Sequence, residues 1–212
     1  MKPLFLITFF SLFTFNLSLS QHQLPFESKD NRIELSVRNT STVPASGVTV
    51  EVSNVPGWLH FTSSSQAIKQ LKAKEDTAAS FTFSVDKLAP VNKLQTLTFT
   101  ITSSTGEKWT KQLDVSVNPP DHFELYQNYP NPFNPSTTIS YLLPADTRNI
   151  LKIYNSIGQE VTTLVNGERS AGYNEEVWNA SNVATGMYIY QLTMNDQQGK
   201  KEFYRKKMLM VK

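Results

Sequence analysis

The residue types that carry most enzyme and metal chemistry are few in this chain, and they are widely spaced. Its three histidines, His22, His60 and His122, are too far apart in sequence to predict a metal cluster. The absence of cysteine excludes disulfides, thiolate metal ligands and a cysteine nucleophile. The sequence also contains no Gly-x-Ser-x-Gly motif and no phosphate-binding glycine loop. We therefore expect no cofactor, no metal site and no catalytic residue, and we predict that the protein is not an enzyme.

The composition is that of an ordinary globular protein. A net charge of +2 is too close to neutral to indicate nucleic acid or a membrane surface as a partner. With 212 residues and 39% hydrophobic content, the chain can form one or two packed cores. The neighbouring acidic residues Glu75-Asp76 and Glu175-Glu176 would point to opposite faces of a strand, which indicates a solvated surface rather than a paired-carboxylate site.

The first residues have the organisation of a secretory signal peptide. A positive residue near the start is followed by an apolar core from Leu4 to Leu17, and small residues then stand where signal peptidase cuts. The apolar run is shorter than the roughly 20 residues that a membrane-spanning helix needs. We predict a signal peptide over residues 1–20, cleavage between Ser20 and Gln21, and a flexible lead-in over 21–31.

Residues 32–118 alternate polar and apolar side chains in short runs. Ile33, Leu35 and Val37 would face one side of a strand, and further runs of this period follow, separated by turn signals. Six or seven such strands without a convincing helix predict an antiparallel β-sandwich of immunoglobulin size. Trp58, which follows a Pro-Gly turn, has two interpretations: a core residue, which we favour, or an exposed platform for a ligand.

A proline-rich segment separates this domain from a second set of strands. The prolines between Tyr129 and Pro135 restrict the backbone and remove donors, which predicts a stiff, extended linker and motif over residues 119–136. Residues 137–212 have the pattern of seven short strands, and the turn at Gly158 suits a positive φ. The expected fold class is all-β, with two tandem immunoglobulin-like β-sandwich domains after the signal peptide.

The second half of the chain contains an ordered series of motifs. They are Gln127–Pro135, Ile139-Ser140-Tyr141, Ile153-Tyr154-Asn155, Gly158–Val161, Ala171-Gly172, Trp178–Ser181, Ala184–Leu192 and Lys206–Lys212. In these motifs, roughly residues 123–212 resemble the type A C-terminal sorting domains of the type IX secretion system of Bacteroidota. A single Pro-Asn-Pro-Phe match would be weak, but the ordered set is specific.

The resemblance implies how the domain is used. It implies recognition by the type IX translocon, removal by a sortase-like protease, lipopolysaccharide as a candidate anchor, and a final location outside the cell or on its outer surface, reached via the periplasm. The candidate sorting-signal residues are Asn131, Pro132, Phe133, Asn134, Pro135, Gly158, Gly186, Lys206, Lys207, Met208, Leu209, Val211 and Lys212. We expect the two glycines to act structurally, at turns.

The last predicted strand is strongly basic. Lysines there would keep an exposed edge strand soluble and block edge-to-edge pairing. The resemblance implies that the same segment is recognised by the translocon. Both roles are compatible, because an exposed edge strand can be recognised by strand addition.

The first domain resembles, less specifically, the immunoglobulin-like accessory and adhesion modules found beside bacterial glycosidases and in surface proteins. The residues that carry this resemblance are Asn39-Thr40-Ser41, Val48–Val52 and Val55–Leu59. We predict a non-enzymatic passenger with an unknown extracellular ligand and no nucleic-acid partner. The alternative is an accessory or truncated part of an extracellular carbohydrate-active enzyme, although a signal peptide and two domains of about 90 residues leave no room for a catalytic domain.

Overall fold

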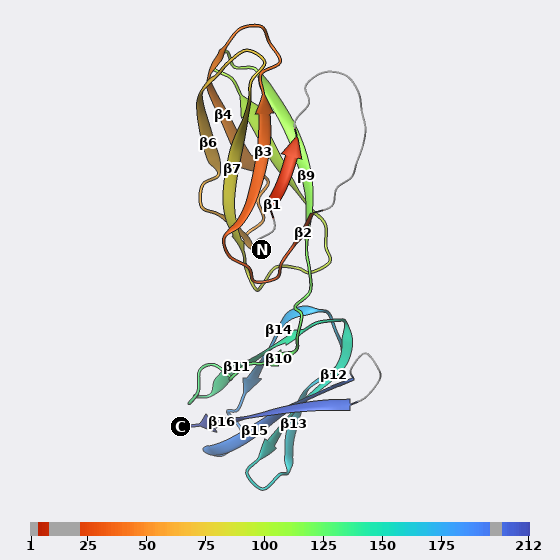
Figure 1. The fold of residues 1–212 in the computed structure, drawn as a ribbon. Coiled ribbons are helices and arrows are strands. Elements are labelled where there is room, and N and C mark those ends of the chain that lie inside the picture. Colours follow the sequence, from red (N-terminus) through yellow and green to blue (C-terminus); the bar gives the residue numbers. More distant parts are fainter. Residues whose placement is uncertain (1–3, 9–21, 196–200) are drawn as a thin grey trace. The chain divides into compact units, whose positions relative to one another are not determined.

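The computed structural model describes residues 4–8, 22–195 and 201–212. All the secondary-structure elements within these ranges are β-strands (Figure 1). The chain divides into two compact units, Met1–Asn118 and Pro119–Lys212. In the described ranges no helix has the length and apolarity needed to cross a membrane. The predicted all-β class is confirmed. The predicted cleavage site between Ser20 and Gln21 lies outside the described residues.

The first unit is a sandwich of two sheets. One sheet has the order β1–β3–β7–β5 and consists of β1 (Leu4–Thr8), β3 (Asn31–Arg38), β7 (Asp76–Val85) and β5 (Leu59–Phe61). The other has the order β2–β9–β8–β4–β6 and consists of β2 (His22–Leu24), β9 (Lys108–Val117), β8 (Gln95–Thr102), β4 (Ala45–Ser53) and β6 (Ser65–Leu71). Strand β1 pairs in parallel with β3 and β2 in parallel with β9, whereas the other pairs are antiparallel.

The core of the first unit lies between these two sheets. Ile33, Leu35 and Val37 of β3 are buried, as their alternation predicts, because successive residues of a strand point to opposite faces. Aromatic rings fill the centre: the Phe81 ring of β7 lies 5.5 Å from the Phe99 ring of β8, a distance typical of packed aromatic pairs. Contacts of this kind join one sheet to the other.

The second unit also has two sheets. The smaller has the order β10–β11–β14 and consists of β10 (Glu124–Leu125), β11 (Ser136–Leu143) and β14 (Gly172–Asn179). The larger has the order β13–β12–β15–β16 and consists of β13 (Glu160–Arg169), β12 (Thr147–Asn155), β15 (Gly186–Asn195) and β16 (Lys201–Met210). All pairs are antiparallel, and β16 forms one edge of the larger sheet. Tyr141, Leu151 and Tyr190 are fully buried between the sheets.

The segment 119–136, predicted as a linker and motif, is largely part of the second unit. Leu125 of β10 is buried, and Phe133 is 1% exposed within the same hydrophobic core as Tyr141 and Tyr190. The prolines rule out a central strand or a helix, as expected, but they do not keep the segment away from the domain. From β10 onward the segment therefore contributes to the second unit, because Leu125 and Phe133 help to fill its core.

Candidate functional site

The proline-rich motif contacts the end of the last strand. The Phe133 N–H donates to the Leu209 carbonyl at 3.0 Å, and the Val211 N–H donates to the Phe133 carbonyl at 3.0 Å. These two bonds form a parallel β-bridge between Phe133 and Met210. The two ends of the motif series, about 80 residues apart in the chain, are thus joined by backbone hydrogen bonds.

Two side chains of the motif extend this contact along β16. The Asn131 Oδ1 accepts a hydrogen bond from the Leu209 N–H at 2.9 Å, and the Gln127 Nε2 donates to the Lys207 carbonyl at 2.8 Å. We call the contact of Gln127, Asn131 and Phe133 with residues 207–211 the terminal junction. Because it already occupies the outer edge of β16 over these residues, the edge is not free there for strand addition.

The side chain of Phe133 anchors the junction in the core. Its ring lies 5.5 Å from the Trp178 ring, and the Trp178 ring lies 5.2 Å from that of Tyr188 in an edge-to-face arrangement. Trp178 comes from β14 and Tyr188 from β15, so the three rings connect the motif to both sheets. The single apolar residue between the prolines therefore determines where the motif docks.

A buried polar network holds the base of the motif loop. Tyr129 and Thr138 exchange two backbone hydrogen bonds of 2.9 Å, which close the loop. Inside it, the Asn128 Nδ2 donates to the Thr137 hydroxyl at 2.8 Å and to the Pro130 carbonyl at 3.0 Å. Asn128 and Thr137 are each 2% exposed, so these bonds satisfy groups that water does not reach.

Tyr190 connects this network to the larger sheet. Its hydroxyl accepts from the Asn128 N–H at 2.9 Å and donates to the Tyr126 carbonyl at 2.7 Å. Burial raises the pKa of Tyr190 to about 12. Sequence analysis included Asn128 and Tyr190 in motifs but not among the site residues. The signal for Asn128 was an amide directly before a proline-rich turn, a position where Asn often bonds to nearby backbone.

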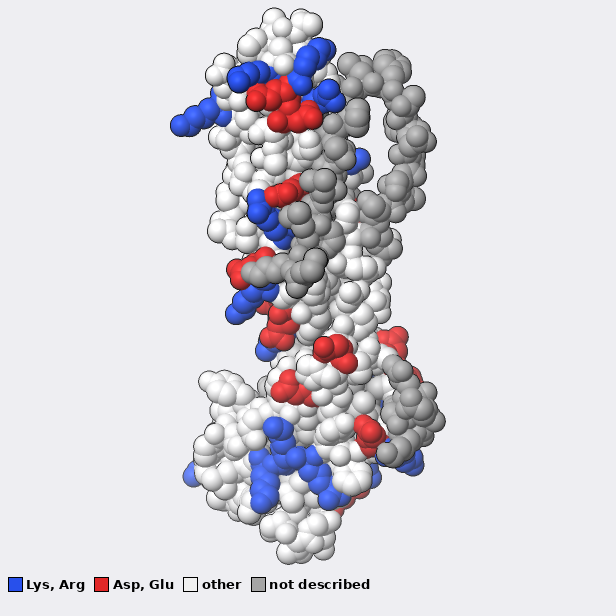
Figure 2. All heavy atoms as spheres, in the orientation of Figure 1, with Lys and Arg blue, Asp and Glu red and all other residues white. Residues whose placement is uncertain are grey.

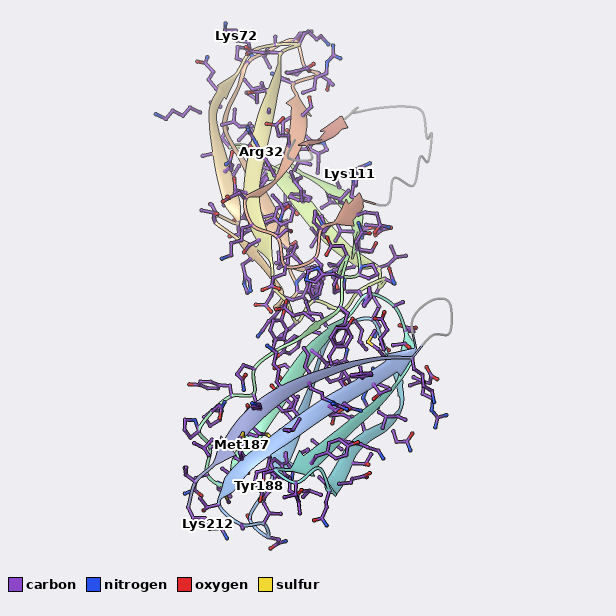
Figure 3. All side chains as sticks on the ribbon, turned by 60° about the horizontal axis from the view of Figure 1, so that its bottom comes forward. Arg32, Lys72, Lys111, Met187, Tyr188 and Lys212 are labelled. Atoms are coloured by element: carbon purple, nitrogen blue, oxygen red, sulfur yellow. The ribbon has the colours of Figure 1, made fainter. Side chains whose placement is uncertain are left out.

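The outer face of the larger sheet is apolar at one end and basic along β16. In the register, Met187 of β15 stands opposite Leu209 of β16, and the two side chains are 47% and 43% exposed. Lys207 and Arg205 continue the same face of β16, since they alternate with buried Met208. Lys and Arg side chains gather over β15 and β16 in Figure 2, and Met187 lies at the same end of the second unit as Lys212 in Figure 3.

The other predicted sorting-signal residues differ in their exposure. Pro132, Asn134, Pro135 and Lys212 are exposed, and Pro135 accepts a backbone hydrogen bond from Ala180 at 2.8 Å. Met208 is buried, Lys206 is partly buried, and Val211 takes part in the junction.

The two predicted glycines lie in different places. Gly186 begins β15 opposite Met210, close to the junction. Gly158 has φ +83° in the turn between β12 and β13, where its N–H donates to the Asn155 carbonyl at 3.0 Å. Among the described residues, no contact joins Gly158 to the junction. Its role in the β12–β13 hairpin is that of a turn residue.

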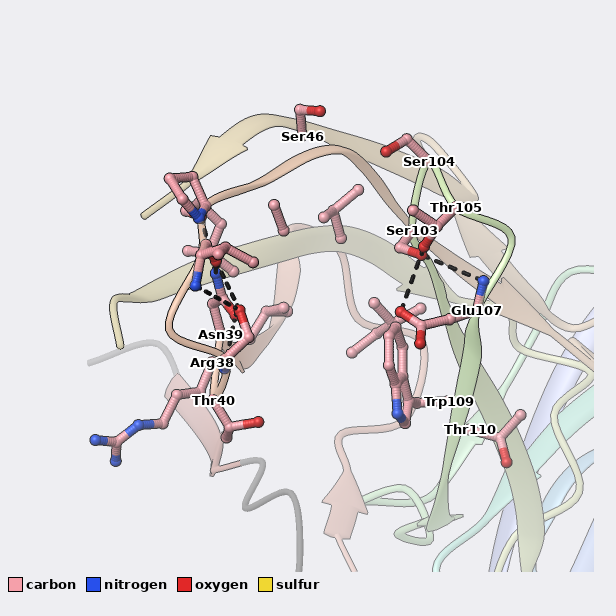
Figure 4. A pocket seen from close by; sticks show the side chains of 18 residues that line it. Arg38, Asn39, Thr40, Ser46, Ser103, Ser104, Thr105, Glu107, Trp109 and Thr110 are labelled. Atoms are coloured by element: carbon pink, nitrogen blue, oxygen red, sulfur yellow. Dashed lines mark hydrogen bonds between the residues drawn. The ribbon is translucent and has the colours of Figure 1, made fainter. Parts of the chain in front are cut away.

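In the first unit, Trp58 is partly buried and packs against the hydrophobic core, in agreement with the interpretation of this residue as a core residue. A different tryptophan, Trp109 of β9, is 46% exposed and lines a cavity of about 880 Å³ at one end of the sandwich (Figure 4). Sequence analysis did not single out Trp109, because its position in the alternation is that of a core residue. Among the residues that the structure describes, no group of three or more His, Cys, Asp or Glu side chains could hold a metal.

The fold and the junction together define the second unit as a folded terminal module rather than a flexible tail. Residues 127–206 match the family of secretion system C-terminal sorting domains. This match identifies the module as a type IX C-terminal sorting domain, which interacts with the type IX secretion machinery and directs export through the periplasm to the cell surface or the outside. No curated protein sequence matches the chain significantly.

The solved structures that the chain matches are only distantly similar to it. Latent dimeric PorU from Porphyromonas gingivalis is 14% identical with a TM-score of 0.37; the alignment covers 92% of this chain, which spans 19% of PorU. The CupB2 chaperone of Pseudomonas aeruginosa is 12% identical, with a TM-score of 0.28 and coverage of 88% of this chain and 97% of that one. The E. coli chaperone DraB is 11% identical, with a TM-score of 0.32 and coverage of 92% and 98%.

Proposed function

We propose that this chain is a non-enzymatic exported protein, in which the first unit is an immunoglobulin-like passenger and the second delivers it to the outside. The signal peptide over residues 1–20 directs passage into the periplasm, where both units fold. The type IX machinery then recognises the second unit. The observation that supports this proposal most directly is the terminal junction, in which Phe133 and Asn131 bond to Leu209.

The junction bears on what the machinery recognises. Since the edge of β16 is occupied at residues 207–211, the accessible part of the strand over these residues is its outward side-chain face. That face combines exposed Met187 and Leu209 with the cations of Arg205 and Lys207. An apolar centre with charged surroundings is typical of protein-binding surfaces. In this proposal the sorting signal is a folded surface, and the motif acts by holding β16 in place.

A sortase-like protease removes the module after export, and the passenger is released or anchored to lipopolysaccharide. The segment that suits cleavage lies just after the boundary of the two units. The side chains of Asp121 and His122 are 94% and 64% exposed, and no strand includes them. Exposed segments outside strands are where proteases cut, because the backbone must leave its hydrogen bonds to enter an active site. We place the cut within residues 119–122.

The test is fractionation of cells that carry the type IX machinery. We expect the wild-type passenger outside the cell, with an intact mass that lacks the second unit. Deletion of residues 121–212 leaves the passenger in the periplasm. In the full chain, Leu209→Glu and Met187→Glu place charges on the outward face without touching the core, and each is expected to cause periplasmic retention.

The matched control is Val177→Glu. Val177 is 65% exposed on β14, in the smaller sheet of the same unit, so the change adds the same charge to a different face. We expect normal export of this variant. Normal export of Leu209→Glu and Met187→Glu would show that the outward face of β15 and β16 is not recognised. Surface delivery of the 121–212 deletion would overturn the sorting role itself.

A further inference from the structure

We propose that the cavity beside Trp109 in the first unit is a binding site for a neutral saccharide. The proposal goes beyond export, because it concerns what the passenger does once it is outside. It rests on the shape of the cavity, on one uncovered aromatic ring and on the chemistry of the rim (Figure 4). At about 880 Å³ the cavity is within the usual size of small-ligand sites.

The cavity forms where the two sheets of the sandwich end. Its base consists of four aliphatic core residues, each 6% exposed or less: Val37, Val48, Leu71 and Ile101. The loop after β3 stands on one side, and the β8–β9 hairpin on the other. Gly47 brings β4 close to that hairpin, since a Cβ at this residue would lie 3.3 Å from the Ser104 Cβ. The site is therefore a concave pocket with an apolar base.

The exposed side chain of Trp109 is the feature that most strongly indicates a ligand-binding site. It stands opposite Ile101 in the β8–β9 register, so both side chains point to the inner face of the sheet. Ile101 is 6% exposed, but the larger indole of Trp109 is 46% exposed. The indole thus extends beyond the core into the cavity, and almost half of its surface is left open. A large aromatic surface left open in a pocket provides an apolar face on which the C–H face of a sugar ring can lie.

The rim provides polar groups that are free to bond. Within the part of the chain that the structure describes, the Ser104 hydroxyl at the mouth of the cavity makes no hydrogen bond, and neither does the Trp109 indole N–H (Figure 4). A serine hydroxyl can donate one hydrogen bond and accept two. The Ser103 hydroxyl is instead held by Thr105 at 2.7 Å and helps to order the hairpin. Sugar hydroxyls are suited to a rim of this kind, because they also both donate and accept.

The charges at the rim favour a neutral ligand over an ionic one. Among the described residues that line the cavity, one is a cation, Arg38, and one is an anion, Glu107. The Arg38 Nε lies 3.3 Å from the Asp76 carboxylate, and the Glu107 carboxylate accepts a hydrogen bond from the Thr105 hydroxyl at 3.3 Å. Neither sign of charge dominates, so the pocket provides no field that would select a sulfated, phosphorylated or uronic acid ligand.

The test uses the purified full chain and affinity gel electrophoresis with soluble polysaccharides. The neutral probes are laminarin, xylan and mannan, the acidic probe is alginate, and a further arm uses delipidated surface polysaccharide of the producing cells. We expect at least one neutral probe to retard the protein, and binding to shift the Trp109 fluorescence to the blue. Binding only to the cells' own polysaccharide would identify that as the source of the saccharide, and binding to the other probes a foreign source.

Three variants locate the binding. Trp109→Ala should weaken it about tenfold or more, as loss of a central aromatic contact does, while Trp109→Phe retains most of it. Ser104→Phe places a ring at the mouth of the pocket from an exposed position and should also abolish binding. The matched control is Leu88→Ala, since Leu88 is 63% exposed in the same unit and does not line the cavity. Thermal unfolding of each variant verifies that it is folded.

The proposal is overturned if neither a neutral probe nor the cells' own polysaccharide binds, if alginate binds in preference, or if Trp109→Ala and Ser104→Phe bind as the wild type does. Binding of an apolar peptide at the cavity in place of any saccharide would overturn it as well. All these measurements are made on purified protein. Their failure would leave the export proposal untouched, and failure of export would not change the binding result.

Discussion

The side chain of Asn131 accepts a hydrogen bond from the backbone N–H of Leu209 at 2.9 Å, across 78 residues of sequence. The donor is on the edge strand β16, where β15 cannot provide a partner on the outer side. Asn131 therefore provides the hydrogen-bond acceptor that a neighbouring strand would otherwise provide at the end of β16. Leu209 itself keeps its side chain 43% exposed, so the same residue is held by its backbone and displayed by its side chain.

Asn131→Ala removes this bond and leaves the Leu209 N–H to solvent. We expect a loss of about 1 kcal/mol in the stability of the second unit and reduced export, because the end of β16 is held less firmly. Chemical denaturation and cell fractionation measure the two effects. Asn134→Ala is the control, since Asn134 is exposed in the same motif and its side chain makes no hydrogen bond among the described residues. Equal behaviour of the two variants would contradict the role of Asn131.

Phe133→Ala leaves a cavity between the motif and Trp178. Because Phe133 is 1% exposed, we expect the second unit to lose about 3–5 kcal/mol, while the unfolding of the first unit stays unchanged. Calorimetry of the full chain should resolve the two transitions, and the near-UV circular dichroism of Trp178 should weaken. Tyr129→Ala, at a residue that is 81% exposed, should cost less than about 0.5 kcal/mol. A small effect of Phe133→Ala would mean that the motif does not depend on its aromatic anchor.

Two buried tyrosines predict a loss of stability at alkaline pH. Burial raises the pKa of Tyr141 and of Tyr190 from 10.0 to about 12 in the folded protein. Folding therefore favours the protonated form, and this contribution is complete below pH 10. It decreases as the pH rises towards 12, by about 2 kcal/mol for each tyrosine. Denaturation between pH 9 and 12 measures the decrease, and Tyr141→Phe and Tyr190→Phe should each reduce it. Identical pH profiles for wild type and both variants would disprove this assignment.

The same two tyrosines should respond differently to removal of the hydroxyl at neutral pH. The Tyr190 hydroxyl bonds to Tyr126 and Asn128, so Tyr190→Phe leaves buried backbone groups without a partner and should cost about 1–3 kcal/mol. Among the described residues the Tyr141 hydroxyl has no hydrogen-bond partner although it is buried, so Tyr141→Phe should be neutral or slightly stabilising. Urea denaturation of both variants tests this order, and the reverse order would contradict the hydrogen-bonding pattern.

Gly158→Ala tests whether this predicted site residue is only structural. Its φ of +83° disfavours any side chain, although a Cβ would meet no atom within 4 Å. We expect a loss of about 1 kcal/mol from the backbone alone and unchanged export. Thermal unfolding and fractionation check the two parts. Periplasmic retention of a folded Gly158→Ala protein would assign the glycine a direct role in sorting.

Much of the secondary structure of this protein could be predicted from short stretches of its sequence. Alternation such as Ile33, Leu35 and Val37 predicts a half-buried strand, because the period of a strand is two whichever partner it has. Gly158 and its neighbours predict a hairpin, because the turn conformation depends on residues next to one another. The ordered motifs of residues 123–212 also identified the sorting domain, because the family is recognised by residue types and their order along the chain.

Tertiary structure alone decided which distant residues meet. Neither the proline motif nor β16 contains a signal that Asn131 and Phe133 bond to Leu209, since a hydrogen bond across 78 residues depends on how two sheets close around a core. Trp109 is the second case. Its alternation marks it as inward-facing, but the sandwich ends before it covers the ring. Periodicity determines the face on which a residue lies, whereas the extent of the opposing sheet determines whether that face is buried.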